Sequence, residues 1–202
     1  IGNTFTKLFK NKTYSQGVLA QIFYVGAQIM CWTYIYQYAE GIGMDSVTAG
    51  YYQMAAFILF TLGRAIGTYM LRFINAGKLL MLFAFFAIVS TLGVVTINNI
   101  LGLYCLVGIS FFMSLMFPTI YGIALGKLTE EESKIGSAGL VMAIVGGALM
   151  PKLQGMIIDV GGYGVNDVNI FGISEINFSF LLPAFCFVFI AAYGFKNQKT
   201  LR

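Results

Sequence analysis

Six long apolar stretches constrain this chain more than any other feature of its sequence. Each has the length that an α-helix needs to cross the roughly 30 Å hydrocarbon core of a bilayer. The stretches are residues 17–39, 48–71, 79–97, 100–125, 136–158 and 177–195. Hydrophobic residues make up 58% of the sequence and charged residues 10%, which is far from the composition of a soluble domain. The sequence therefore predicts an all-α integral membrane protein with six transmembrane helices.

Lysine and arginine indicate how these helices are oriented. All but one of the 12 basic residues fall on one side of the predicted bilayer, and the exception is Lys152. Because basic loops stay in the cytoplasm, we expect both termini to be cytoplasmic in a multi-pass protein of the bacterial inner membrane. Residues 1–16 would form a cytoplasmic linker, 17–195 a six-helix domain and 196–202 a cytoplasmic tail. This topology explains the net charge of +4, so we do not expect nucleic-acid binding.

The ends of the sequence and its cysteines exclude other classes of protein. The first sixteen residues are polar and basic, unlike a secretory signal, and the chain lacks an initiating Met, so we expect a piece of a longer protein. Cys31, Cys105 and Cys186 fall inside predicted spans without CxxC spacing. We therefore expect small buried thiols and no metal site.

The first stretch carries polar and aromatic side chains along one helical face. These residues are Gln21, Tyr24, Gln28, Trp32 and Tyr36, and they fall within an arc of about 120°. An unsatisfied amide in hydrocarbon costs several kcal/mol, so this face must meet protein or water. An uncharged, aromatic face at this depth suits a neutral polyhydroxylated ligand.

The fourth stretch carries a second polar face. Ser110, Ser114, Phe117 and Tyr121 share this face, and Pro118 removes one helical hydrogen bond. One interpretation is that the serines form hydrogen bonds between helices and that the proline makes an ordinary kink. The other is that this face forms a second wall of the cavity that the first stretch faces. The six stretches also divide, by the kinds of side chain they carry, into two groups of three, as the inverted three-helix repeats of transporters do. In such transporters the substrate site usually lies near the midplane of the bilayer.

Lys152 and Gln154 in the fifth stretch admit two interpretations. Lys152 could extend toward the outer headgroups, or it could face the cavity as a donor to substrate, with Gln154 nearby. The six stretches contain no Asp or Glu, and the chain has no His, so a Ser/His mechanism lacks its base. We therefore expect no enzyme, and we expect any proton-carrying carboxylate to lie elsewhere.

The connection between the second and third stretches reads GRAIGTYMLRF. Gly63 and Gly67 would allow close packing of helices, while Arg64 and Arg72 are expected at the cytoplasmic interface. The two arginines could be topological anchors, or a charge latch that forms a cytoplasmic gate.

Four segments, residues 19–34, 63–73, 111–126 and 144–159, closely resemble the C-terminal half of bacterial L-fucose permeases. These belong to the fucose/galactose/glucose:proton symporters of the major facilitator superfamily. The resemblance implies a twelve-helix transporter in which this chain supplies helices seven to twelve and its partner is a missing N-terminal six-helix half. It also implies a monosaccharide substrate, a proton as coupling ion, no other cofactor, and a gate role for the GRxxGxxxxR segment.

The sequence thus predicts half of a proton-coupled L-fucose symporter that works by alternating access. The amides and tyrosine hydroxyls would replace the hydration of the sugar, and Trp32 would stack on its ring. Lys152 departs from the uncharged pattern of L-fucose permeases, which leaves a different sugar open. The alternatives are a facilitator for another small solute, such as another sugar, an organic anion or a drug, and a non-transporting membrane sensor with the same fold.

Overall fold

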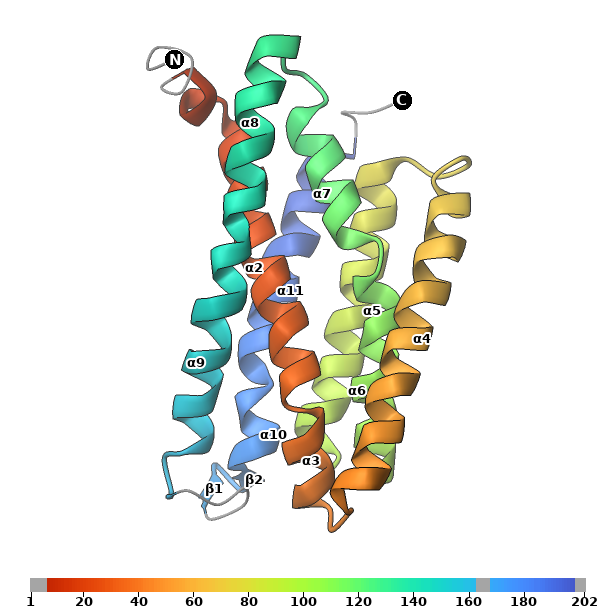
Figure 1. The fold of residues 1–202 in the computed structure, drawn as a ribbon, viewed down its shortest axis with the longest axis vertical. Coiled ribbons are helices and arrows are strands. Elements are labelled where there is room, and N and C mark those ends of the chain that lie inside the picture. Colours follow the sequence, from red (N-terminus) through yellow and green to blue (C-terminus); the bar gives the residue numbers. More distant parts are fainter. Residues whose placement is uncertain (1–6, 163–167, 199–202) are drawn as a thin grey trace.

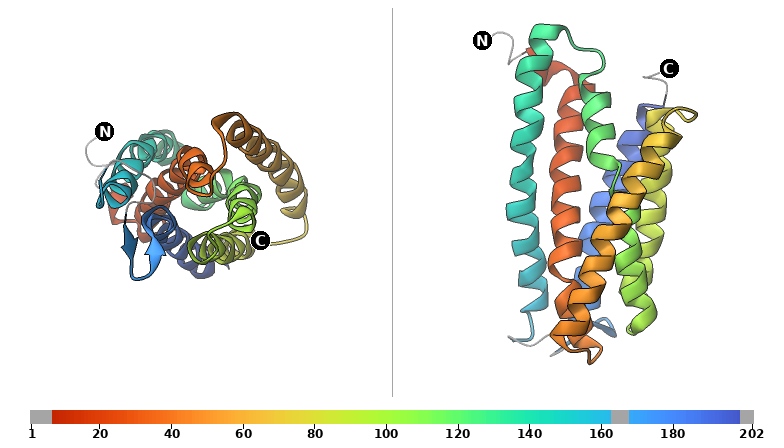
Figure 2. Two further views of the ribbon diagram at one scale, coloured as in Figure 1. Left: turned by 90° about the horizontal axis from the view of Figure 1, so that it is seen from below. Right: turned by 45° about the vertical axis from the view of Figure 1, so that its right-hand side comes forward.

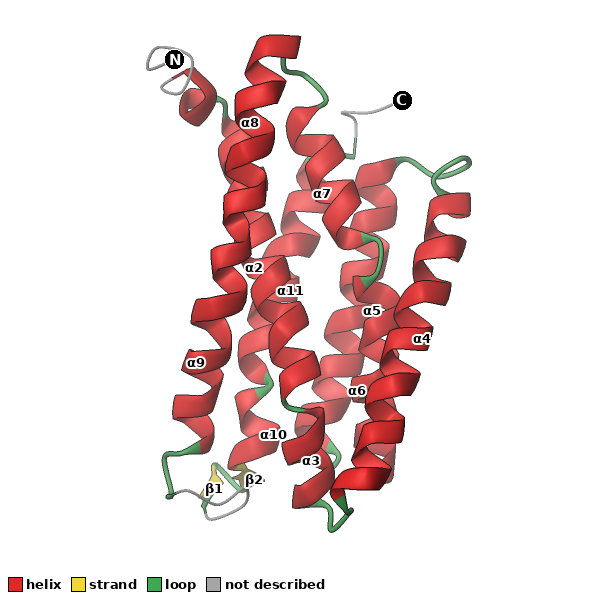
Figure 3. Ribbon diagram, viewed as in Figure 1, coloured by secondary structure: helices red, strands yellow, loops and turns green. Residues whose placement is uncertain are grey.

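The computed structural model describes residues 7–162 and 168–198, and it is mostly helical (Figure 1, Figure 3). Residues 7–10 are helical. The helices that follow are α2 (Lys12–Thr33), α3 (Ile35–Gly41), α4 (Ser46–Met70), α5 (Ala76–Thr96), α6 (Ile100–Met113) and α7 (Met116–Leu125). They are followed by α8 (Glu130–Met142), the 3₁₀ turn η1 (Ala143–Val145), α9 (Gly146–Ile158), α10 (Glu175–Ser179) and α11 (Leu181–Lys196). Residues 1–6 of the predicted linker and 199–202 of the predicted tail lie outside the described residues.

Two short strands join α9 to α10. Strands β1 (Asn169–Ile170) and β2 (Ile173–Ser174) pair antiparallel, with Asn169 opposite Ser174. Phe171 and Gly172 between them have positive φ angles of 54° and 82°. Glycine adopts such angles without strain, which accounts for Gly172 in this tight turn.

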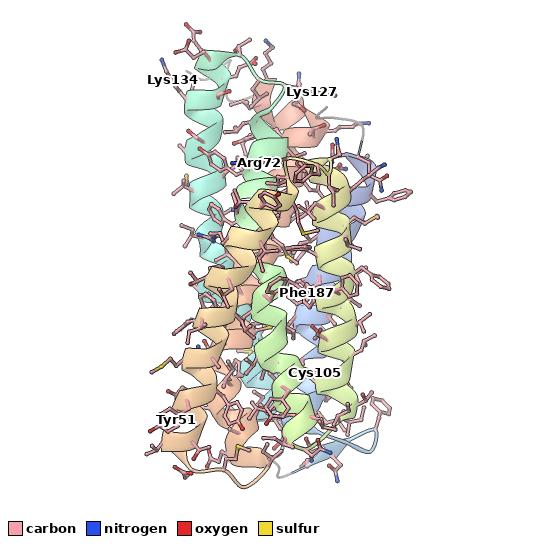
Figure 4. All side chains as sticks on the ribbon, turned by 90° about the vertical axis from the view of Figure 1, so that its right-hand side faces the viewer. Tyr51, Arg72, Cys105, Lys127, Lys134 and Phe187 are labelled. Atoms are coloured by element: carbon pink, nitrogen blue, oxygen red, sulfur yellow. The ribbon has the colours of Figure 1, made fainter. Side chains whose placement is uncertain are left out.

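The long helices run along one axis and are arranged around α2, α6 and α7. Helices α5 and α11 pack on each other over most of their length, and α2 contacts α7, α9 and α11. Helix α4 packs on α6 and α3, whereas α9 packs on α2 and α10. Seen from below, α4 and α9 therefore lie on opposite flanks of the bundle (Figure 2). Phe187 of α11 is fully buried in the core (Figure 4).

Four helical segments in the described part of the chain are long and apolar enough to cross a membrane. They are Ala76–Thr96, Ile100–Leu125, Glu130–Ile158 and Glu175–Lys196. A fifth is obtained if α2 and α3, which meet at an angle of 41°, form one broken span. Helix α4 has 25 residues but is not among them, because tyrosines, Gln53 and Arg64 lower its average hydropathy. The prediction of spanning helices is confirmed for these four, and the sixth span rests on α4.

Helices α4 and α8–α9 bury much less of their surface than the others. In α4 only Ala49, Ala56, Gly63 and Gly67 are buried. The most apolar part of Glu130–Ile158 is 22% buried, against 44–56% for the other three spanning segments. The two flanks therefore present broad apolar faces, which require lipid or further protein to cover them.

Several helices begin at a side chain that caps the first free N–H groups. Asn11, Asn75 and Asn99 do so for α2, α5 and α6, as short polar side chains generally do. Asp45 accepts from the Val47 and Thr48 N–H groups at the start of α4. The Thr48 hydroxyl also donates to Asp45 and holds the pKa of that carboxyl below its usual range.

Proline explains two interruptions of the long helices. Pro118 and Pro183 each stand four residues after the point at which a helix stops, near Ser114 and Ser179. Proline has no N–H for the carbonyl four residues earlier, and its ring collides with that carbonyl. Helices α6 and α10 therefore end at these positions, and α7 and α11 begin anew.

Hydrogen bonds from polar side chains connect neighbouring segments at each end of the bundle. Asn177 of α10 is 1% exposed and donates to the Val94 carbonyl at 2.7 Å, while the Tyr38 hydroxyl donates to the Ile97 carbonyl. At the other end, the Tyr14 hydroxyl donates to the Gly136 carbonyl at 2.9 Å. These bonds satisfy buried backbone carbonyls, which would otherwise cost free energy.

Basic side chains gather at one end of the bundle. Arg72, Lys127 and Lys134 lie at the end where α2 begins and α11 ends, whereas Tyr51 and Cys105 lie at the opposite end (Figure 4). Two ion pairs are formed there, between Lys7 and Glu132 at 2.7 Å and between Lys134 and Glu130 at 3.1 Å. The clustering matches the charge asymmetry from which the topology was predicted.

Candidate functional site

One face of α2 and α3 carries the residues Gln21, Tyr24, Gln28, Trp32 and Tyr36, here called the α2 stripe. The half of this stripe nearest the basic end is buried among the helices. Gln21 and Tyr24 are both 0% exposed. The Tyr24 ring packs against Phe117 of α7 at a centroid distance of 6.0 Å, and Phe117 stacks on Tyr121 at 6.5 Å. Gln21 and Tyr24 therefore meet protein, which is one of the two surroundings expected for this face. Helix α7 packs on α2 and covers Tyr24 with Phe117.

These buried groups have an unusual property. Neither the Nε2 nor the Oε1 atom of Gln21 has a hydrogen-bond partner among the described residues, and the same holds for the Tyr24 hydroxyl. A buried polar group without a partner costs about 1–3 kcal/mol. Such groups are therefore unexplained by folding alone, and a polar ligand or water would satisfy them.

Trp32 joins three helices at the centre of the stripe. Its indole N–H donates to the Ser110 hydroxyl of α6 at 3.2 Å. Its ring also makes edge contacts with Phe57 and Phe60 of α4, at centroid distances of 4.9 and 5.1 Å. The structure thus brings together Trp32 and Ser110, which the sequence had placed on two separate faces.

The remaining stripe residues are progressively more accessible. Gln28 is half-buried, one helical turn from both Tyr24 and Trp32. Tyr36 is 43% exposed, beyond the 41° bend between α2 and α3. Beside Trp32, a hollow of about 310 Å³ lies over α4 and is lined by Met54, Phe57, Ile58, Thr61 and Leu62. The stripe therefore runs from a buried amide to an accessible phenol.

The serines of the fourth span lie where α6 ends. Ser110 and Ser114 are both 0% exposed. The Ser114 hydroxyl donates to the Phe111 carbonyl at 2.7 Å, so it is satisfied within its own helix. Tyr121 is half-buried and stacked on Phe117. Of the two serines, Ser110 therefore contacts the α2 stripe directly.

The structure separates the two arginines of the GRAIGTYMLRF segment. Arg72 is exposed in the turn after α4, with its guanidinium 5.9 Å from the centre of the Tyr69 ring. Arg64 lies about 9 Å inside the end of α4, at 1.5 Å per residue, and its Nε donates to the Ser114 carbonyl at 3.1 Å. Because α4 continues as a helix to Met70, the two arginines lie at different heights along the bundle, and the interfacial location of both stays a prediction.

The two glycines of this segment allow α4 to approach α6 closely. A Cβ atom on Gly63 would lie 2.4 Å from the Phe111 carbonyl oxygen, and one on Gly67 would lie 3.0 Å from the Leu115 side chain. The predicted packing role of both glycines is confirmed. Their contacts place the segment against the α6–α7 break.

Lys152 and Gln154 point to different sides of α9. Lys152 is exposed, and neither ion pair of the described residues involves it. Gln154 is 0% exposed, and its Nε2 donates to the Ser179 hydroxyl at 3.0 Å, while its Oε1 atom has no partner. The structure therefore does not bring these two residues together.

Two further amides and one acid, which the sequence patterns did not indicate as site residues, carry buried polar atoms. Gln37 of α3 and Gln53 of α4 each bury a carbonyl oxygen without a hydrogen bond in the described structure. Glu175 at the start of α10 is 0% exposed. The signal was present, because a buried amide is costly at any position of an apolar stretch, and Gln37 and Gln53 lie in the first two stretches. Cys31 and Cys186 are buried free thiols, as expected, whereas Cys105 is a free thiol that is only half-buried.

Three transporters or symporters illustrate what the sequence is similar to. No family model matches the sequence. It is 51% identical over 98% of its length to the L-fucose-proton symporter of Haemophilus influenzae, and it covers 44% of that protein. It is 31% identical over 96% of its length to the L-fucose-proton symporter of Escherichia coli, covering 42% of it. A glucose/galactose transporter of Brucella abortus is 30% identical over 91% of the chain, which covers 42% of that protein.

Solved structures agree with these relatives. The crystal structure of the major facilitator superfamily transporter FucP in the outward conformation matches 99% of this chain with a TM-score of 0.86 and 30% identity. The chain covers 46% of that protein. It therefore spans less than half the length of the relatives it matches, and it corresponds to their C-terminal half. The resemblance to L-fucose permeases is confirmed, and each relative named here is a transporter or symporter, not an enzyme.

Proposed function

We propose that this chain is the C-terminal six-helix half of a proton-coupled L-fucose symporter that works by alternating access. The observation that carries this proposal is the 51% identity to an L-fucose-proton symporter across 98% of the chain. The fold supports it, since the chain matches half of a major facilitator transporter at a TM-score of 0.86.

The six-span topology is part of the proposal. Helix α4 would be the sixth span, arranged with α2–α3 and α5 as one repeat, and the remaining helices would form the second, inverted repeat. The apolar faces of α4 and α8–α9, which are little buried here, would meet the N-terminal six-helix half of the same protein and lipid. The common location of Arg72, Lys127 and Lys134 (Figure 4) supports cytoplasmic termini in a bacterial inner membrane.

The proposed sugar site is the α2 stripe together with the facing part of α6 and α7. Gln28 and Trp32 lie at its centre, where Gln28 remains accessible and Trp32 provides an aromatic surface for the sugar ring. Gln21 and Tyr24 would donate to and accept from sugar hydroxyls, because their polar atoms have no protein partner in the described structure. The other proposed contacts are Tyr36, Ser110, Ser114, Tyr121, Lys152 and Gln154.

The proton would be the only coupling species. The buried polar side chains of the α2 stripe are amides, a phenol and an indole, which bind sugar but do not titrate near neutral pH. We therefore place the titrating carboxylates in the other half of the protein.

A different monosaccharide is the second candidate substrate. The Brucella abortus relative is named a glucose/galactose transporter and is 30% identical over 91% of the chain. The two substrates are distinguished by measuring the uptake of labelled sugar by the full-length protein in proteoliposomes that were preloaded with unlabelled sugar. Faster uptake of labelled L-fucose than of D-glucose or D-galactose supports the L-fucose proposal, and the opposite order assigns the other substrate. Binding of any of these sugars without exchange would instead indicate a non-transporting sensor.

A further inference from the structure

The break between α6 and α7 leaves one backbone carbonyl without its helical donor. In a continuous helix the Ser114 carbonyl would accept the N–H of the residue four positions later. That residue is Pro118, which has no N–H and whose ring collides with this carbonyl. Ser114 is 0% exposed, so its carbonyl is not open to water while Arg64 is in place.

Arg64 of α4 supplies the donor that Pro118 removed. Its Nε lies 3.1 Å from the Ser114 carbonyl oxygen. The approach is possible because the preceding residue is Gly63, where a Cβ atom would lie 2.7 Å from the Ser114 hydroxyl. A hydrogen bond from a charged donor is stronger than one between neutral groups, so this contact is well suited to hold a bent backbone.

The same arginine is connected to the proposed sugar site by aromatic contacts. Its guanidinium carbon lies 4.8 Å from the centre of the Phe60 ring. Phe60 contacts Trp32, and Trp32 donates to Ser110, one turn before Ser114 on the same helix. The contacts from Arg64 through Phe60, Trp32 and Ser110 to Ser114 therefore form a closed ring around the break.

We propose that Arg64 is a positioning residue that holds the α6–α7 break through the Ser114 carbonyl, and thereby holds Ser110 and Trp32 in the geometry that receives the sugar. The part about the sugar rests on the proposed function, whereas the part about the break does not. Without Arg64, the Ser114 carbonyl has no donor, and α7 is free to change its angle to α6. Replacing Pro118 by alanine restores the missing N–H and makes the Arg64 bond redundant.

The test uses the full-length protein in lipid nanodiscs without sugar. Spin labels at Leu101 and Lys127, both exposed and at opposite ends of α6–α7, report the distance across the break by pulsed electron spin resonance. R64M should broaden the distance distribution, and R64M with P118A should make it narrow again. R72M, which changes the other arginine of the segment, should leave it unchanged.

Two results would overturn the proposal. One is an R64M distribution as narrow as that of the unchanged protein, and the other is a double mutant as broad as R64M alone. If R64M does not fold, recovery of folding in the double mutant supports the proposal, and failure to recover overturns it. These outcomes need no sugar, so they stand apart from any failure of the transport proposal.

Sugar binding provides the second measurement. R64M should raise the Kd for L-fucose about tenfold, which is near the lower end of the effect of losing a hydrogen bond from a charged donor. Adding P118A should recover most of the lost affinity. Full loss of binding in both R64M and the double mutant, together with a restored distance distribution, would assign Arg64 a direct contact with the sugar and overturn the positioning role.

Discussion

The indole N–H of Trp32 donates to the Ser110 hydroxyl at 3.2 Å, which joins α2 to α6 in the middle of the bundle. The bond orients an aromatic ring that also makes T-shaped contacts with Phe57 and Phe60. Few rotamers are left to Trp32 in this arrangement. A ring held in this way is ready to stack on a ligand without paying the entropy of ordering.

The first prediction concerns Ser110→Ala. Loss of the acceptor leaves the Trp32 N–H without its partner, so the ring becomes less ordered. Because a neutral hydrogen bond contributes about 0.5–1.5 kcal/mol, we expect about 2- to 12-fold weaker L-fucose binding. Equilibrium binding to purified full-length protein measures this. Ser90→Ala on α5, outside the site, is the matched control and should bind normally; equal affinities of the two variants would show that the bond does not serve the site.

The second prediction concerns the unpartnered amide of Gln21. Gln21→Leu removes a buried polar group that has no partner in the described structure, so the sugar-free protein should unfold at a higher temperature while its sugar binding falls. Gln154→Leu should instead lower the unfolding temperature, because Gln154 donates to Ser179. Thermal unfolding and sugar binding are measured on the same samples. A destabilised Gln21→Leu protein with unchanged binding would make Gln21 a structural residue.

The third prediction concerns the close approach of α4 to α6. Gly63→Ala places a Cβ atom 2.4 Å from the Phe111 carbonyl oxygen, and overpacking of this kind costs about 1–3 kcal/mol. We expect a lower unfolding temperature. Gly108→Ala on α6, where a Cβ atom meets nothing within 4 Å, should be neutral or slightly stabilising because alanine favours helix. If Gly63→Ala is as stable as Gly108→Ala, the two helices do not pack as described.

The fourth prediction concerns the end of the bundle opposite the basic residues. Asn177→Ala leaves the Val94 carbonyl without its side-chain donor at 2.7 Å, and a buried group that loses its partner costs about 1–3 kcal/mol. The unfolding temperature should fall while sugar affinity is retained, because Asn177 lies away from the stripe. Asn98→Ala, which changes an exposed asparagine just after the end of α5, should have no effect. A similar small change in both variants would contradict the role given to Asn177.

Hydropathy alone predicted most of the fold. The predicted spans 79–97 and 100–125 agree with Ala76–Thr96 and Ile100–Leu125, because each span is one continuous apolar stretch bounded by a capping asparagine. The bend of 41° between α2 and α3 was not predicted, since no proline or glycine marks Tyr34, where it occurs.

The site was predicted in part. Helical phase placed Trp32 and Gln28 on one face. It could not show that Gln21 and Tyr24 are buried, because their burial depends on how the other helices pack against α2. Phase also could not show that Ser110, and not Ser114, bonds to Trp32. Sequence patterns also could not show that Arg64 donates to the Ser114 carbonyl, because that bond depends on how closely α4 packs against the α6–α7 break.

The central claim is that the intact protein moves L-fucose together with a proton, and sugar-linked proton uptake tests it most directly. Cells that express the full-length protein are suspended in weakly buffered medium, and the external pH is followed after the addition of L-fucose, D-galactose or D-glucose. The account predicts alkalinisation with L-fucose that a protonophore abolishes. Absence of alkalinisation with all three sugars, in cells where the protein is present in the membrane, would contradict it.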